Sequence, residues 1–187
     1  MLVLPEADGG FVVDVIGIVG GECSGKTTLA AALCDSLDGV VVSEYLRQWV
    51  DERDRVPVST DQLGILAGQE SAQEHAISRA VADDRQWVIA DPSPFMTAIY
   101  SIEYFDDPSL LARGIAGLAE NRMTLWCRPD FPWQADGIKR DGPQYRDRVD
   151  SLIADVAAAH SLNLIEVRGP LEERVKQALN EMDVVES

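Results

Sequence analysis

The sequence predicts an α/β protein in which helices cover both faces of a parallel β-sheet. Along the 187 residues, short apolar segments rich in β-branched side chains alternate five times with stretches of helical periodicity. Continuous apolar strands are typical of parallel sheets buried on both faces, and the alternation is typical of α/β domains. A glycine-rich turn directly follows the first apolar segment, which marks a place where the backbone bends sharply.

The first half of the chain contains three of the predicted strands. Residues 12–19 are dominated by valine and isoleucine and predict a buried strand. Residues 27–37 carry apolar side chains at helical spacing, and Gly39 ends that helix before a second strand at 40–43. Helices are expected over 45–55 and 60–83, separated by a loop, and the apolar segment 87–91 predicts the third strand.

The second half continues the pattern. Pro92 and Pro94 predict a rigid turn, and helical pieces are expected from there to residue 120. Strands are expected at 122–127 and 163–167, and helices at 145–160 and 171–182. The segment 128–144 holds three prolines, two glycines and many charges, which indicates a surface loop or lid. We expect one domain over residues 1–187, with a flexible tail at 1–10 and a lid at 128–148.

The charge and hydropathy of the chain limit its partners. The formal net charge of −16 repels nucleic-acid phosphates, so no nucleic-acid partner is expected. No apolar run is long enough to cross a bilayer, and the first residues lack the basic start of a signal peptide. We therefore expect a cytoplasmic protein without a membrane partner, whereas the sequence does not predict its oligomeric state.

A phosphate-binding loop follows the first predicted strand. Residues 20–27 match the pattern G-x-x-x-x-G-K-[ST] between a strand and a helix, where glycines let backbone amides converge on phosphates. Lys26 is predicted to reach the β- and γ-phosphates and Thr27 to supply a hydroxyl to Mg²⁺. The alternative, a glycine-rich turn without a ligand, leaves Lys26 unexplained. The residues predicted to bind ATP are Gly20, Gly21, Glu22, Cys23, Ser24, Gly25, Lys26, Thr27 and Thr28.

Two carboxylates follow other predicted strands. Asp91 ends the third strand, where a carboxylate suits binding of Mg²⁺; the alternative is a turn residue before Pro92. Glu44 ends the second strand, and ligands of doubly wound sheets gather at the carboxyl ends of strands. Glu44 is therefore predicted to accept the proton of a hydroxyl that attacks the γ-phosphate; the alternative is an ion pair with Arg47.

A group of cations lies around the predicted lid. A lid that closes over phosphates would supply such side chains to the transferred phosphoryl group; the alternative is a solvated loop with scattered charges. The spacing does not select one cation over another. The group consists of Arg128, Lys139, Arg140, Arg146 and Arg148.

Together these motifs resemble the ribosylnicotinamide kinase domain of NadR-type proteins and the related small P-loop ATPases. The similarity runs through about residues 12–182. The matching pieces are the strand and loop 17–27, Glu44-Tyr45-x-Arg47, Gln69, Asp91 and Trp133-x-x-Asp136-Gly137.

The resemblance implies a three-layer P-loop fold with a 2-3-1-4-5 parallel sheet. It also implies transfer of the ATP γ-phosphate to the 5′-hydroxyl of a nucleoside such as ribosylnicotinamide, a step of NAD biosynthesis. The family tends to carry a second acid where Ser93 stands, and an arginine where Lys139 precedes Arg140. The implied catalytic residues are Lys26, Glu44, Asp91 and Arg140, and the implied substrate-binding residues are Glu44, Tyr45, Arg47, Trp133 and Asp136.

Two further functions remain open on the sequence. One is a kinase of another nucleoside or of a nucleotide, although a nucleotide acceptor needs a second phosphate clamp and no basic cluster outside the lid supplies one. The other is an ATP-dependent switch that binds a protein partner, which predicts slow hydrolysis and a conformational change on nucleotide binding.

Overall fold

The computed structural model describes residues 12–133 and 142–185. The predicted tail at 1–10 and the predicted site residues Asp136 and Arg140 lie outside the described residues. The elements are β1 (Asp14–Val19), α1 (Lys26–Leu37), β2 (Val40–Val42), α2 (Tyr45–Arg53), the 3₁₀ helix η1 (Ser59–Asp61), α3 (Gln62–Ala82), β3 (Trp87–Ala90), α4 (Phe95–Phe105), α5 (Leu111–Leu118), β4 (Met123–Cys127), α6 (Pro143–His160), β5 (Ile165–Val167) and α7 (Leu171–Val185).

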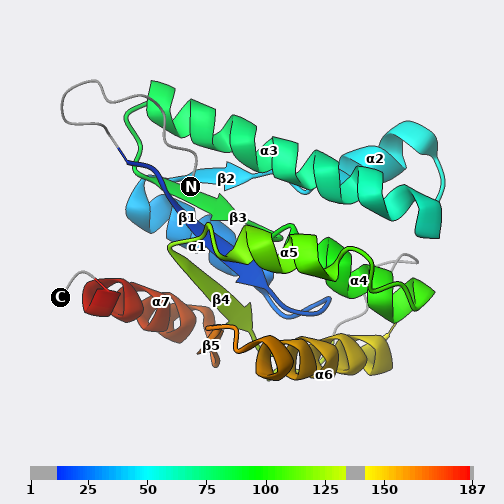
Figure 1. Ribbon diagram of the computed structural model, residues 1–187. Coiled ribbons are helices and arrows are strands. Elements are labelled where there is room, and N and C mark those ends of the chain that lie inside the picture. Colours follow the sequence, from blue (N-terminus) through cyan, green and yellow to red (C-terminus); the bar gives the residue numbers. More distant parts are fainter. Residues whose placement is uncertain (1–11, 134–141, 186–187) are drawn as a thin grey trace.

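The five strands form one sheet in the order β2-β3-β1-β4-β5, and all neighbouring pairs are parallel. This confirms the predicted sheet and its order. The first strand of the chain, β1, lies at the centre, between β3 and β4 (Figure 1). Because all strands are parallel, their carboxyl ends meet at one edge of the sheet, where functional residues of such folds gather.

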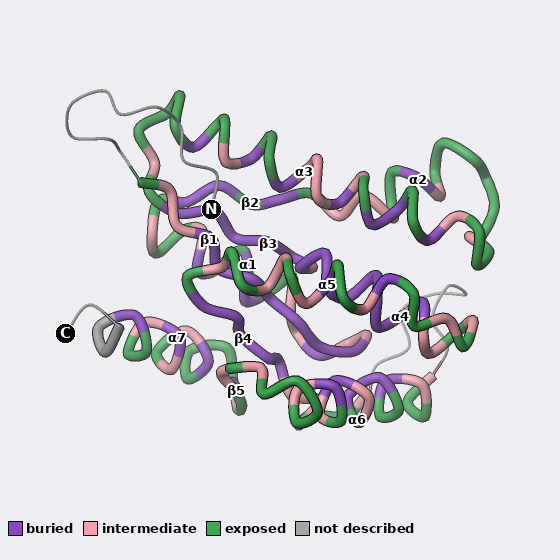
Figure 2. The backbone as a smooth tube through the Cα atoms, viewed as in Figure 1, coloured by how far each residue is buried: buried purple, intermediate pink, exposed green. Residues whose placement is uncertain are grey.

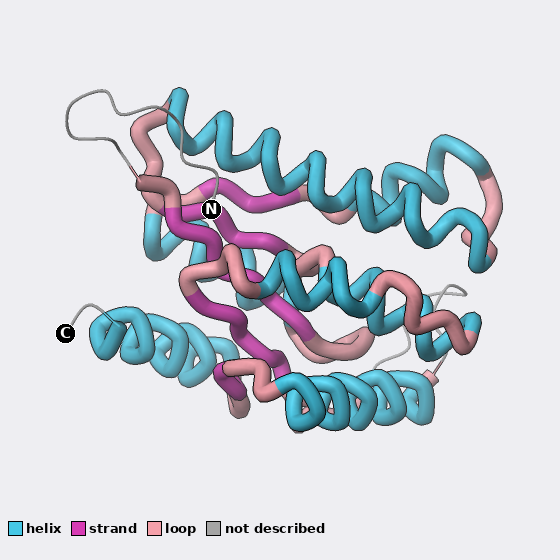
Figure 3. The backbone as a smooth tube through the Cα atoms, in the orientation of Figure 1, coloured by secondary structure: helices cyan, strands magenta, loops and turns pink. Residues whose placement is uncertain are grey.

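Helices cover both faces of the sheet, so the molecule has the three predicted layers (Figure 3). On one face, α1 and α7 pack against a core that includes Ile16, Ile18 and Leu125. On the other face, α4 and α6 pack against Val19 and Trp126, while α3 packs against β2 and β3. The central strands are buried along their length, whereas the outer helices alternate between buried and exposed turns (Figure 2).

Several predicted boundaries shift by a few residues. The first strand begins at Asp14 rather than at residue 12. The second helix ends at Arg53 rather than at residue 55, because Asp54 adopts a left-handed backbone conformation with φ of 49°. The helical region after Pro94 divides into α4 and α5, and Asp106, with φ of 53°, ends the first of them. No helix in the described part of the chain is both long and apolar enough to span a membrane.

Candidate active site

The glycines of the loop between β1 and α1 are required by its shape. Gly20 has a φ of +145°, and a Cβ atom there would lie 2.7 Å from the backbone oxygen of Cys127. Gly25, at the N-terminus of α1, has a φ of +84°, a conformation that L side chains rarely adopt. The backbone therefore takes the curled path predicted for a phosphate-binding loop.

Two side chains of this loop fold back onto its backbone. The Lys26 ammonium group donates a hydrogen bond to the backbone oxygen of Gly21 at 2.8 Å, and the Ser24 hydroxyl donates to the same oxygen at 2.8 Å. The Lys26 charge thus lies against the loop, within reach of any phosphate that the loop amides and the α1 N-terminus hold.

The structure brings Thr27 and Asp91 together, the two residues predicted to bind Mg²⁺. The Asp91 carboxylate, which follows β3, is 7% exposed and accepts a hydrogen bond from the Thr27 side chain. Burial raises the pKa of Asp91 above its usual value, although the nearby Lys26 charge and the Thr27 hydrogen bond oppose the shift. A hydroxyl and a carboxylate are both hard oxygen donors, which fits the ligand preference of Mg²⁺.

Glu44 lies near the same position. Its charge is close enough to contribute to the raised pKa of Asp91, so the carboxyl ends of β2 and β3 do place these residues near each other. Glu44 also forms an ion pair with Arg47, the alternative that the sequence left open. The Arg47 side chain is 69% exposed, so this pair lies at the solvent boundary of the site and contributes little to stability.

Tyr100 is a site residue that sequence reasoning missed. Burial and the charges of Glu22, Glu44 and Asp91 all raise the pKa of its hydroxyl, which places it beside the phosphate loop and both strand-end carboxylates. The residue lies in the middle of α4, a helix expected only as an unspecified piece. Its spacing from other residues in the sequence carries no signal for this contact.

Two further aromatic rings pack in sequence beyond Tyr100. The ring centroids of Tyr100 and Tyr104 are 5.9 Å apart, and Tyr104 stacks on Tyr145 of α6 at 6.1 Å. By contrast, the Trp49 side chain of α2 is 4% exposed. The guanidinium groups of Arg53 and Arg55 both lie 4.7 Å from the centre of its ring, so its role is in packing.

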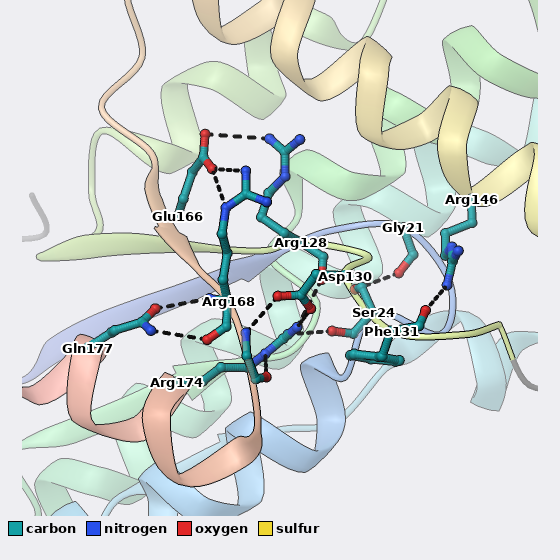
Figure 4. A network of polar contacts seen from close by, with 11 residues as sticks. Gly21, Ser24, Arg128, Asp130, Phe131, Arg146, Glu166, Arg168, Arg174 and Gln177 are labelled. Atoms are coloured by element: carbon teal, nitrogen blue, oxygen red, sulfur yellow. Dashed lines mark hydrogen bonds and ion pairs between the residues drawn. The ribbon is translucent and has the colours of Figure 1, made fainter.

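A buried arginine from the last helix supports the phosphate loop. Arg174 of α7 is 2% exposed and donates to the backbone oxygens of Ser24 at 2.7 Å and Arg128 at 2.9 Å. It also donates to the backbone oxygen of Gly169 at 2.8 Å and forms an ion pair with Asp130 (Figure 4). Arg174 thus joins the loop after β1 to the segments after β4 and β5.

The predicted lid cations have different positions. Arg128 stacks on Trp126 at 3.9 Å and pairs with Asp150 at 2.9 Å, and Arg148 pairs with Glu103. These two side chains therefore serve packing and ion pairs. Arg146 is 8% exposed, and its guanidinium donates to the backbone oxygen of Phe131 at 3.0 Å (Figure 4).

Arg146 is thus the member of the group that the structure places against the phosphate loop. Its backbone oxygen and side-chain Cγ lie 3.0 Å and 3.2 Å from where a Cβ atom on Gly21 would be. The remaining members, Lys139 and Arg140, fall outside the described residues. Trp133 is described, and its indole nitrogen is buried without a hydrogen-bond partner among the described residues.

A metal site built entirely from protein side chains does not appear in the described ranges, where no three His, Cys, Asp or Glu residues cluster. The Mg²⁺ site predicted from the sequence is of another kind, in which one hydroxyl, one carboxylate and substrate phosphates share the ion. Thr27 and Asp91 are the residues that would hold it.

Three solved structures share the fold of this protein at low sequence identity. A NadR protein in complex with NR superposes with a TM-score of 0.70 at 16% identity, covering 92% of this chain and 50% of that chain. Deoxyadenosine kinase from M. mycoides gives a TM-score of 0.60 at 13% identity, covering 91% and 99%. Thymidylate kinase from Ehrlichia chaffeensis gives 0.61 at 16% identity, covering 93% and 99%.

The protein thus spans about half the length of the NadR chain that it matches. No curated protein matches it in sequence. A family model described as an AAA domain matches residues 15–174, from the second residue of β1 to the arginine in α7 that supports the phosphate loop. Because this match covers most of the sequence, the protein belongs to this family of AAA domains.

Proposed function

We propose that the protein is an ATP-dependent kinase that transfers the γ-phosphate of ATP to the 5′-hydroxyl of a nucleoside, with ribosylnicotinamide as the preferred acceptor. The observation that carries the proposal is the contact between Thr27 and Asp91, with Lys26 and Glu44 close enough to shift the pKa of the same carboxylate. Lys26, which can neutralise phosphates, and Glu44, which can receive a proton, thus both lie near Asp91.

Each residue then has a role in phosphoryl transfer. The loop amides and Lys26 hold the phosphates, and the N-terminus of α1 adds its positive dipole. Thr27 and Asp91 would hold Mg²⁺, which would supply positive charge against the phosphate oxygens. Glu44 accepts the proton of the attacking hydroxyl. Of the predicted lid cations that the structure describes, Arg146 lies beside Gly21 and takes the stabilising role predicted for a lid residue.

The electrostatics of the acceptor side favour a nucleoside over a nucleotide. Glu22, Glu44 and Asp91 all act on the Tyr100 hydroxyl, so three carboxylates surround this part of the site. An acceptor that already carries a phosphate would be repelled there, whereas a neutral or cationic nucleoside would not. The rings of Tyr100 and Tyr104 offer a surface for a planar base, and a cationic ring would gain cation–π attraction.

The comparisons support the class of reaction. One solved relative in fold is a NadR protein in complex with NR, and another is a NadR protein in complex with NAD and AMP-PNP, with 18% identity and a TM-score of 0.70. Deoxyadenosine kinase and thymidylate kinase share the fold over nearly their whole length. The names of these two enzymes suggest the alternative acceptors to be tested beside ribosylnicotinamide.

The test is consumption of ATP with Mg²⁺ in the presence of single acceptors: ribosylnicotinamide, deoxyadenosine, thymidine and thymidylate. Lys26→Ala serves as the blank, and Lys176→Ala serves as a matched control, because Lys176 is an exposed lysine on α7. We expect ribosylnicotinamide to raise turnover many-fold over the basal rate and to yield its 5′-monophosphate, with Lys176→Ala unchanged.

Three other outcomes would revise the proposal. Stimulation by deoxyadenosine or thymidine alone would keep the kinase class and replace the acceptor. Stimulation by thymidylate would contradict the electrostatic argument against an anionic acceptor. A slow basal rate that no acceptor changes, with ATP still bound, would refute the kinase for this panel and favour an ATP-dependent switch.

A further inference from the structure

One buried side chain connects the two strand ends that carry Glu44 and Asp91. Gln69, in the middle of α3, is 2% exposed. Its Oε1 accepts a hydrogen bond from the backbone N–H of Tyr45 at 2.8 Å. Its Nε2 donates to the backbone oxygen of Ser43 at 3.4 Å and to that of Pro92 at 3.2 Å.

The partners of Gln69 fix the orientation of its amide group. Only the amide oxygen can accept from the Tyr45 N–H, and only the amide nitrogen can donate to two backbone oxygens. Both amide hydrogens are used, each by a different strand end. Among the twenty side chains, only asparagine and glutamine offer one acceptor and two donors on a single neutral planar group.

The three backbone groups that bind Gln69 belong to residues next to Glu44 and Asp91 in the sequence. Ser43 and Tyr45 are the neighbours of Glu44 on either side, so Gln69 holds the backbone of Glu44 from both directions. Pro92 is the neighbour of Asp91. The same amide group therefore sets the separation between the residue that would receive the proton and the residue that would hold Mg²⁺.

Gly68, the residue before Gln69, lies directly beneath the ring of Tyr45. A Cβ atom on Gly68 would lie 2.1 Å, 2.3 Å and 2.4 Å from three atoms of the Tyr45 ring, so this ring packs directly onto the backbone of α3. Any side chain at position 68 would displace Tyr45. Gly68 and Gln69 together thus fix the position of the chain at Glu44 and Tyr45.

We infer that Gln69 is a positioning residue for phosphoryl transfer, which holds Glu44 and Asp91 in register through their backbones without touching the substrate. The inference rests on the proposed function, because it concerns the residues assigned there to the acceptor and to Mg²⁺. A displacement of about 1 Å in a catalytic group lowers rates by about 100-fold. The loss of Gln69 is therefore expected to lower kcat about 10- to 100-fold.

The α3 helix supplies a matched control for each substitution. Gln69→Met removes all three hydrogen bonds and keeps the length of the side chain. Gln73→Met makes the same change one turn later, at a buried glutamine whose Oε1 has no partner among the described residues. Gly68→Ala places a methyl group against Tyr45, whereas Gly64→Ala places one where nothing lies within 4 Å.

Two measurements separate positioning from general loss of structure. In steady-state kinetics, Gln69→Met and Gly68→Ala should lower kcat at least ten-fold and leave the KM for ATP within about three-fold of the wild type, because the phosphate loop keeps its contacts. In calorimetry without Mg²⁺, Gln69→Met and Gln73→Met should bind AMP-PNP with the same affinity as the wild type. The gain in affinity on adding Mg²⁺ should shrink only in Gln69→Met.

The inference is wrong if Gln69→Met matches Gln73→Met in kcat and in the Mg²⁺-dependent gain. If Gln69→Met does not fold, as judged by loss of AMP-PNP binding without Mg²⁺, the kinetic comparison of Gly68→Ala with Gly64→Ala decides. If the wild type shows no acceptor-dependent turnover, the proposed function fails, while the calorimetric comparison still tests Gln69. Asp91→Asn supplies the reference for a lost Mg²⁺ ligand.

Discussion

The contacts of Arg174 predict a large loss of stability when this single side chain is replaced. Arg174→Met removes donors from the backbone oxygens of Ser24, Arg128 and Gly169. It also leaves the Asp130 carboxylate without its counter-ion. Methionine retains most of the apolar length of the side chain, so the loss comes from the polar contacts.

The magnitude follows from the burial of the two partners. Removal of one member of a buried ion pair costs about 3–5 kcal/mol. The Asp130 side chain is 23% exposed, so water partly solvates the carboxylate that is left, and the lower end applies. We therefore expect a loss of about 3 kcal/mol in the free energy of unfolding, which lowers Tm by about 6–12 °C for a domain of this size.

Denaturant unfolding at pH 7 measures this loss, with Arg168→Met as the control. Arg168 belongs to the same polar network, but its side chain is 53% exposed and its ion pair with Glu166 lies at the surface. Its removal should change the free energy of unfolding by less than about 1 kcal/mol. A loss below about 1 kcal/mol for Arg174→Met would refute the reasoning, because a loss that small is typical of an exposed ion pair.

The pH dependence provides a second check. Burial acts to raise the pKa of Asp130, but the Gly169 N–H and the Arg174 guanidinium outweigh it, so the pKa lies below its usual value. The ion pair therefore stabilises the fold above the unfolded pKa of the carboxyl, and this stabilisation is lost as the pH falls through the folded pKa. The difference between the wild type and Arg174→Met should shrink between pH 5 and the acid limit of folding.

Three further predictions concern the site. Burial raises the pKa of Asp91, so its ionised form lowers stability at neutral pH; Asp91→Asn should keep or raise Tm in a thermal melt at pH 7 and lower turnover about 100-fold or more. Gly20→Ala places a methyl group 2.7 Å from the Cys127 backbone oxygen and should weaken AMP-PNP binding at least ten-fold in calorimetry. Burial raises the pKa of the Cys127 thiol to about 11, so iodoacetamide at pH 8 should modify Cys127 only after unfolding, as mass spectrometry would show.

Much of the fold was predictable because its determinants are local. Each strand is a short apolar run, and the phosphate loop is a contiguous motif whose glycines and lysine act on neighbouring backbone atoms. The errors are shifts of a few residues at the ends of helices and strands. Asp54 and Asp106 end helices in a left-handed conformation that glycine usually adopts. Because aspartate stands there in place of glycine, the sequence does not mark these two helix ends.

The sequence did not predict the contacts that act across long separations, not even those of Gln69, which it offered only as part of the family resemblance. Arg174 contacts Ser24 across 150 positions, and Gln69 contacts Tyr45 and Pro92 across 24 and 23 positions. No periodicity connects such residues, since their contacts exist only after the sheet and helices have packed. Asp136 and Arg140 lie outside the described residues, and their proposed roles stay predictions.

The sheet order has a consequence for folding during synthesis. Of the five strands of this sheet, β1 is made before the others and is the central strand, and both of its neighbours, β3 and β4, are made later. The contact from Arg174 to the phosphate loop must wait for 150 more residues, which takes about 10–30 s at the usual rates of translation. The segment that would bind ATP is thus made before most of the sheet that surrounds it, and it acquires the support of Arg174 only late in synthesis.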